Sequence, residues 1–130
     1  MTHDGLDGYP LVDDHKVEVR RHGYEVMALT GVDGIDPEND NVDVEVTFED
    51  GGRWGATFVT LENIRVTLDR WRTTGDSRHG LYYWTRCMIV APRLTINVIL
   101  DTVDDMLADD SFKLAFEPLE PLDQEDHDLG

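Results

Sequence analysis

Two neighbouring stretches of the chain alternate apolar and polar residues with the period of two that is typical of β-strands. From Val42 to Phe48 every second residue is apolar, and the same period returns from Trp54 to Phe58. Between them, residues 50–52 (Asp-Gly-Gly) tolerate the backbone angles of a tight turn. The pattern predicts a hairpin with its apolar side chains on one face and acidic residues on the other.

A second alternation precedes this hairpin, in residues 16–29. Val17 and Val19 start a period of two, which breaks at Gly23 and then resumes. A glycine at such a break indicates a bulge or bend in one long strand, or the turn of a short hairpin. Residues 31–41 contain turn-forming residues throughout and predict a loop.

Two later segments repeat apolar residues at the spacing of an α-helix. Thr60 and Thr95 are suited to cap the two N-termini, and Gly75 is suited to end the first helix. The pattern predicts one helix that begins at Leu61 and ends at Gly75, and a second that begins at Ile96 and has Asp109 and Asp110 at its C-terminal end, with one apolar stripe each. The stripes are Leu61, Ile64, Leu68 and Trp71 in the first helix and Ile96, Ile99, Leu100, Val103 and Leu107 in the second.

Residues 81–91 are aromatic, aliphatic or β-branched on both faces and predict a central strand that ends at Pro92. Residues 111–116 predict a short strand or an apolar lid. The element order is therefore β-β-β-α-β-α. We expect an α+β fold, a two-layer sandwich in which two helices cover one face of a mainly antiparallel sheet of about four strands.

Acidic residues dominate the chain, which has 28 Asp and Glu against 11 Lys and Arg and a net charge of −17. Ten of the excess negative charges lie in residues 1–14 and 117–130, which contain no Lys or Arg. Both segments are too poor in apolar residues to form a core. We expect a disordered acidic N-terminal arm over 1–15, a single α+β domain over 16–116 and a disordered acidic tail over 117–130.

Composition also argues against several classes of protein. No apolar run approaches the roughly 18 residues of a membrane-spanning helix, and the first residues lack the basic and apolar regions of a signal peptide. The single cysteine, Cys87, excludes a disulfide framework. Direct binding to nucleic acid is disfavoured because Lys and Arg are scarce. We expect a cytoplasmic protein that binds neither membranes nor nucleic acid directly.

The acidity has two explanations. A negative surface complements a basic partner, such as a toxin or a nuclease, and accelerates association with it. Alternatively, the charge serves solubility in a salty cytoplasm, because Asp outnumbers Glu 19 to 9 and Arg outnumbers Lys nine to two. The sequence leaves both explanations open.

No motif in the sequence predicts catalysis or a cofactor. Residues 36–47 match a calcium-binding loop only in part, because Asn41 and Thr47 stand where that loop needs Gly and Glu. The five histidines lack the spacing of a metal site, and Cys87 lies in a predicted strand, where a buried thiol is inert. Phosphate-binding loops and nucleophile-elbow motifs are absent. We expect no catalytic residue, no metal and no cofactor.

The aromatic segment 82–86 contains the strongest candidates for a binding surface. Tyr, Trp and Arg dominate the energetics of protein interfaces, and a strand would place alternate members of the segment on one face. Acidic residues of the hairpin and of the second helix would add complementary charge. The predicted partner-binding residues are Tyr82, Trp84, Arg86, Asp43, Glu45, Glu49, Asp101, Asp104 and Asp105. The alternative is that the rings fill the core or an interface between two copies of the chain.

Residues 24–116 resemble a family of small bacterial α+β proteins of unassigned function. The resemblance rests on the segments "NVDVEVTFEDG", "ATFVTLENI" and "GLYYW…MIV" and on a helix that runs to a final "F…AF". In size and charge such proteins are similar to the immunity partners of bacterial toxins, by analogy only. The analogy implies a non-catalytic, inhibitor-like protein-binding module against a basic partner. The alternative is a salt-adapted domain, in a homodimer, whose charge serves solubility.

Overall fold

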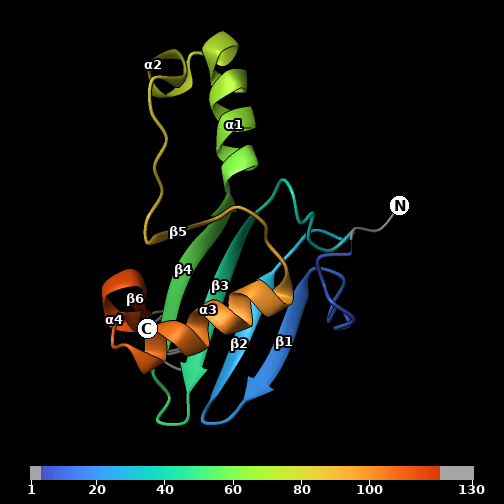
Figure 1. The fold of residues 1–130 in the computed structure, drawn as a ribbon, viewed down its shortest axis with the longest axis vertical. Helices are drawn as coiled ribbons and strands as arrows, with labels where there is room; N and C mark the ends of the chain where they lie inside the picture. The colour runs from blue at the N-terminus through green and yellow to red at the C-terminus, as the bar shows by residue number, and fades with distance from the viewer. Residues whose placement is uncertain (1–3, 121–130) are drawn as a thin grey trace, which may run out of the picture.

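The computed structural model describes residues 4–120 and has an α+β fold, as the sequence predicts (Figure 1). Five strands follow one another in the order β1-β2-β3-β4-β5, and β6 also pairs with β4. Only the β4–β5 pair is parallel. The strands are β1 (Lys16–Arg21), β2 (Tyr24–Leu29), β3 (Asn41–Phe48), β4 (Arg53–Thr60), β5 (Met88–Ala91) and β6 (Glu117–Leu119), and the helices are α1 (Leu61–Thr74), α2 (Asp76–Gly80), α3 (Ile96–Ala108) and α4 (Phe112–Ala115).

The predicted hairpin is present as β3 and β4. Val44 lies opposite Ala56 and Val46 opposite Trp54, so the apolar side chains of both strands face the same side. β1 and β2 form a second antiparallel hairpin. Its turn contains Gly23 at a φ of 94°, a left-handed conformation that glycine adopts without strain. Of the arrangements left open by the sequence, the short hairpin is therefore the one found.

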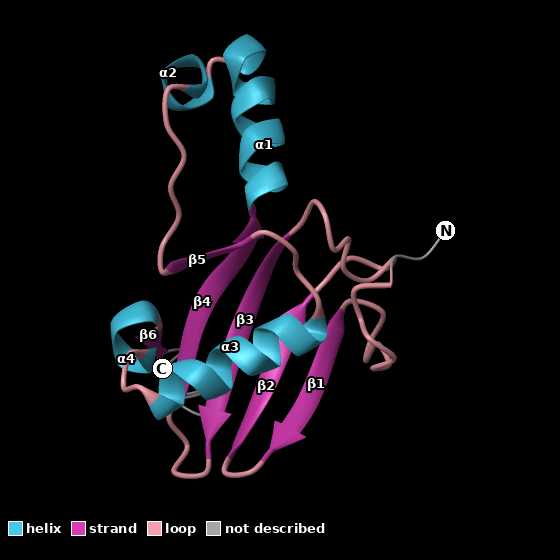
Figure 2. Ribbon diagram, viewed as in Figure 1, coloured by secondary structure: helices cyan, strands magenta, loops and turns pink. Residues whose placement is uncertain are grey.

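The hydrophobic core lies between this apolar face and α3, which crosses the strands (Figure 2). The Thr95 hydroxyl caps α3 by accepting a hydrogen bond from the Val98 amide at 3.2 Å. The predicted stripe of this helix is confirmed, because Ile96, Ile99, Leu100 and Val103 are buried in the core and Leu107 packs at its margin.

Residues 111–116, predicted as a short strand or a lid, form α4 and its C-cap. Phe112 and Phe116 are buried, and their rings stack 4.2 Å apart. Their spacing of four residues places both rings on one side of a helical turn. Together with α3 they cover the apolar face of the sheet, since the Phe116 ring also packs 6.3 Å from that of Phe58 on β4.

The other predicted covering helix, α1, does not lie on the sheet. It starts at Leu61 without any loop residue after β4, so the chain has no turn with which to fold the helix back. α1 therefore projects beyond the end of the sheet (Figure 1). The predicted central strand over 81–91 is a strand only from Met88, because residues 81–87 run beside α1 instead of entering the sheet.

Residues 4–15, which the sequence assigns to a disordered arm, have defined positions on the body of the protein. The Gly5 amide donates to the Ile35 carbonyl at 3.1 Å, and the Gly5 carbonyl accepts from the Ile96 amide at 2.8 Å. A Cβ at Gly5 would lie 2.4 Å from the Ile35 oxygen, so the close approach requires glycine. Three apolar residues of this segment then pack against the core: Leu6, Tyr9 and Leu11.

The C-terminal boundary also differs from the sequence prediction. Residues Glu117–Leu119, placed in a disordered tail, form β6 against the first half of β4. The rest of that predicted tail, residues 121–130, lies outside the described residues. Between residues 4 and 120, none of the helices combines the length and the apolar composition needed to cross a bilayer.

Candidate functional site

α1, α2 and the segment 81–87 form a lobe (residues 61–87) that projects from the sheet (Figure 2). α1 has 14 residues, of which one, Thr67, is buried. α3 has 13 residues, of which four are buried. The helix of the lobe is therefore far less covered than a helix of similar length in the body.

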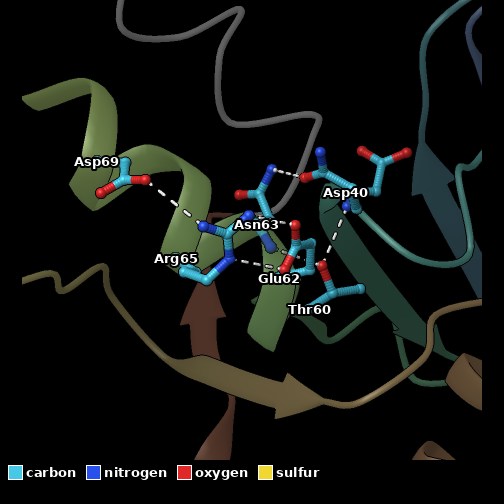
Figure 3. A network of polar contacts seen from close by, with 7 residues as sticks. Asp40, Thr60, Glu62, Asn63, Arg65 and Asp69 are labelled. Carbon is cyan, nitrogen blue, oxygen red and sulfur yellow. Dashed lines mark hydrogen bonds and ion pairs between the residues drawn. The ribbon is translucent and has the colours of Figure 1, made fainter.

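A polar network joins the base of the lobe to the loop before β3 (Figure 3). The buried hydroxyl of Thr60 accepts hydrogen bonds from the Asn63 amide at 3.1 Å and the Asp40 amide at 3.2 Å. The Asn63 side chain donates to that of Asn39 at 2.9 Å. The same threonine thus caps α1 and ties it to the body, which fixes the direction in which the helix leaves the sheet.

Ion pairs within α1 neutralise much of its surface charge. Arg65 donates to both carboxylate oxygens of Glu62, at 2.9 and 2.7 Å, and lies 3.5 Å from Asp69. The hydrogen bond from Arg65 lowers the pKa of Glu62 below its ordinary value. Arg72 lies 3.5 Å from the same Asp69. These pairs are exposed and contribute little stability, but they leave few free charges on this helix.

Tyr83 connects the segment 81–87 to both the helix and the body. Its ring stacks on that of Trp71 with 5.7 Å between the centroids and 18° between the planes. Its hydroxyl accepts a hydrogen bond from the Asn41 side-chain amide at 3.0 Å. Burial raises the pKa of Tyr83, and the hydrogen bond from Asn41 offsets part of that rise. Tyr83 is the packed member of the aromatic run.

α2 is a single left-handed turn that packs closely on α1. Ser77, Arg78 and His79 have φ angles of 47°, 55° and 62°, a conformation that costs about 1–2 kcal/mol per non-glycine residue. The turn ends at Gly80, where a Cβ would lie 2.4 Å from the Leu68 carbonyl oxygen. Glycine is required there for the turn to approach the helix.

The predicted binding residues of the aromatic run lie in this lobe and not on a strand. Tyr82 is 48% exposed and Trp84 is 67% exposed. Two leucines that were not predicted as binding residues are also exposed on the lobe: Leu81, and Leu61, which was predicted in the apolar stripe of α1. Arg86 pairs with Glu117 of β6, with 2.9 Å between its Nε and the carboxylate.

The predicted acidic residues of the hairpin lie on the face of the sheet that no helix covers, or at its turn. Asp43 is exposed and accepts a hydrogen bond from the Thr57 hydroxyl at 3.0 Å. Glu45 is half-buried and accepts two hydrogen bonds from Arg53, each 3.0 Å long. Glu49 is exposed in the turn after β3.

The predicted acidic residues of the second helix lie on the outer side of α3. Asp101, Asp104 and Asp105 are exposed there, and Asp104 pairs with Arg21 of β1 at 2.6 Å. The sheet and α3 separate these residues from Asp43. The predicted acidic residues therefore belong to separate surfaces of the body and do not converge.

A hollow of about 610 Å³ lies at the end of the sheet opposite the lobe. The β3–β4 turn, the end of α3 and α4 surround it, and its lining residues are Phe48, Asp50, Gly52, Trp54, Leu107, Asp110, Phe112 and Lys113. Sequence reasoning missed this site because it depends on contacts between distant segments. The one available signal was the helical spacing of Phe112 and Phe116.

The described residues define a small α+β protein with helices on one face of its sheet and a projecting lobe. Comparisons with protein-family models, with curated proteins and with solved structures found no match. The family resemblance and the immunity analogy therefore stay predictions from the sequence. Within residues 4–120, His, Cys, Asp and Glu side chains form no group of three or more that could hold a metal ion.

Proposed function

We propose that this chain is a non-catalytic protein-binding module and that the lobe is its principal contact surface. The observation that carries the proposal is the low burial of α1 compared with α3. A helix of 14 residues is marginal by itself in water, and in this chain it is packed mainly by α2 and the segment 81–87. A partner that packs on the lobe supplies the missing apolar cover.

The affinity comes mainly from the exposed apolar side chains of the lobe. Trp84 and Leu81 are 67% and 73% exposed, and fully burying such a side chain contributes about 1.5–3 kcal/mol. Tryptophan and tyrosine are also enriched among the residues that dominate protein interfaces. The charges of the lobe contribute less, because three of its five arginines, Arg65, Arg72 and Arg86, already pair with carboxylates of the same chain.

The proposed partner is a basic protein, such as a toxin or nuclease that this chain inhibits. Outside residues 61–87 the chain has 25 acidic and six basic residues. Asp101 and Asp105 are exposed and have no ion-pair partner within residues 4–120. Such charge steers a basic protein toward the body and raises the association rate, while the lobe makes the apolar contact.

A second candidate is a homodimer in which the lobes of two copies pack together. It is favoured by the apolar stripe of α1, which α2 and the segment 81–87 cover only in part and which can pair with the same stripe of a second copy. In that case the acidity serves solubility, and repulsion between the two acidic bodies makes dimerisation strengthen with salt.

Three proteins test the two candidates: the natural chain, the lobe variant Leu81→Ser/Trp84→Ser and the control Val32→Ser. Val32 is 68% exposed in the loop after β2, so its loss removes one side chain of similar fractional exposure outside the lobe. Each protein is immobilised and exposed to lysate of the native host in low and in molar salt. The proposal expects one basic protein retained by the natural chain and by Val32→Ser and lost by the lobe variant.

Retention of the same proteins by all three would refute the lobe as the contact surface. Sedimentation equilibrium of the purified proteins addresses the second candidate. A dimer that strengthens with salt and dissociates in the lobe variant supports self-association, whereas a monomer at every salt concentration excludes it.

A further inference from the structure

The hollow opposite the lobe has the composition of a cation-binding pocket, and we propose that it binds the guanidinium group of an arginine side chain on a protein partner. It lies beside Trp54 at the start of β4, whereas the lobe follows the end of that strand. The inference rests on the protein-binding role proposed above but not on the lobe as contact surface. It can therefore fail or hold independently of that contact.

The walls of the hollow are aromatic and held in place by the core. The Phe112 ring is 2% exposed, and it meets the rings of Phe48 and Trp54 at centroid distances of 5.5 and 5.9 Å. The interplanar angles of these two contacts are 87° and 64°. The face of an indole ring attracts cations, and the planar guanidinium group of arginine also stacks on such a face.

A cation of the same chain already lies over the indole. The Lys113 ammonium nitrogen is 5.5 Å from the centroid of Trp54, within the roughly 6 Å over which this attraction acts. Lys113 is exposed and has no carboxylate partner within the described residues. Its ammonium group is therefore held by the ring alone, and a cation that binds more strongly can displace it into solvent.

Two carboxylates at the rim of the hollow favour a cation over an apolar ligand. Asp50 and Asp110 line the hollow, and neither has an ion-pair partner within residues 4–120. One oxygen of Asp50 accepts the Gly52 amide at 2.8 Å, which fixes the side chain in the turn and leaves the second oxygen free. Guanidinium is the favoured cation because it stacks on a ring and donates in its own plane to carboxylates.

The test is titration of the natural chain with N-acetyl-arginine methylamide, observed through the indole N–H resonances in nitrogen-15 NMR spectra. The neutral isostere N-acetyl-citrulline methylamide is the control ligand. Trp71 and Trp84 lie in the lobe and serve as internal controls, and Trp54→Phe assigns the resonance at the hollow. We expect a saturable shift of the Trp54 resonance alone, with a dissociation constant in the millimolar range, and no shift with the citrulline compound.

Three variants separate the pocket from general attraction to an acidic protein. Lys113→Met removes the internal competitor and should tighten binding roughly two- to fivefold, which is the range of an exposed cation–aromatic contact. Asp110→Asn should weaken binding by about the same factor. Asp33→Asn removes the same charge from the exposed loop after β2, far from the hollow, and should leave the affinity unchanged.

Several results would overturn the proposal. They are an equal shift with the citrulline compound, equal shifts at all three indoles, equal weakening by Asp33→Asn and Asp110→Asn, or no saturable shift in Lys113→Met. Unchanged dispersion of the backbone amide resonances of the strands and α3, in the same spectra, verifies that the body of each variant is folded. Because the probe is a single amino-acid derivative, the outcome does not depend on whether the lobe binds a partner.

Discussion

Replacing Thr60 by valine tests the junction between the sheet and the lobe. Valine has the shape of threonine but lacks the hydroxyl that accepts the amides of Asn63 and Asp40. Loss of an N-cap costs about 1 kcal/mol, and an amide left without a partner costs about a further 1–3 kcal/mol. Burial of the added methyl offsets about 0.8 kcal/mol. We expect a net loss of about 2 kcal/mol in the free energy of unfolding.

Thr95 provides the matched control because its hydroxyl caps α3 by accepting a single hydrogen bond, from the amide of Val98. Its replacement by valine removes the cap but leaves no second amide without a partner. With the same methyl offset we expect a loss of about 0.2 kcal/mol. Serine at either position keeps the hydroxyl and loses only a methyl, so Thr60→Ser should be more stable than Thr60→Val.

Urea unfolding, followed by circular dichroism, measures these differences in the free energy of unfolding. They are obtained from the shift of the urea midpoint, provided that the dependence of the free energy on urea concentration is the same in each variant. Tryptophan fluorescence reports mainly on the lobe, since two of the three tryptophans, Trp71 and Trp84, belong to it. Equal losses for Thr60→Val and Thr95→Val would refute the reasoning, because the second hydrogen bond of Thr60 would then contribute nothing. A valine variant at position 60 more stable than the serine variant would refute it as well.

Three further predictions concern single side chains. Tyr24→Phe removes a buried hydroxyl with no hydrogen-bond partner within residues 4–120. The free energy of unfolding, measured with urea, should therefore stay equal or rise by up to about 1 kcal/mol. A clear loss of stability would contradict this. Gly80→Ala should loosen the lobe and weaken the near-ultraviolet circular dichroism, because its Cβ would meet the Leu68 carbonyl, whereas Gly23→Ala, also at positive φ but in open space, should keep that signal. The pKa of Tyr83 is raised in the folded protein. Its contribution to stability is therefore complete below the unfolded pKa of about 10 and is lost as the pH rises through the folded pKa. Urea titrations across that pH range should show a steeper loss of stability for the natural chain than for Tyr83→Phe.

Local periodicity was enough to predict the elements whose partners lie close by in the chain. The hairpin of β3 and β4 has a clear period of two, and β3 alternates buried valines with more exposed polar residues, whereas the last three residues of β4 are buried on both faces. α3 was predictable because its stripe is wide and its cap is a threonine. In both cases the element contains most of the information about what it packs against.

The lobe was not predictable because its elements do not contain the information about what they pack against. An apolar stripe on α1 indicates a helix but not which surface covers it, and Tyr83 packs on Trp71 and Asn41 instead of entering the sheet. Residues 81–87 have strand-like composition because aromatic side chains suit both a strand and a packed loop. Trp84 was selected from residue type alone, whereas the hollow around Trp54 needed the distant α4 to be in place.

The position of the lobe between two neighbouring parallel strands has a consequence for how such a protein can diversify. β4 leads into the lobe and β5 follows it, with Thr57 directly beside Met88. Any parallel pair of strands needs a crossover connection of about a dozen residues or more. The sheet therefore sets the minimum length of this connection and leaves its further length and structure free. Descendants of this chain can therefore lengthen, shorten or exchange the crossover, and so change what they recognise, while the strands beneath it keep their register.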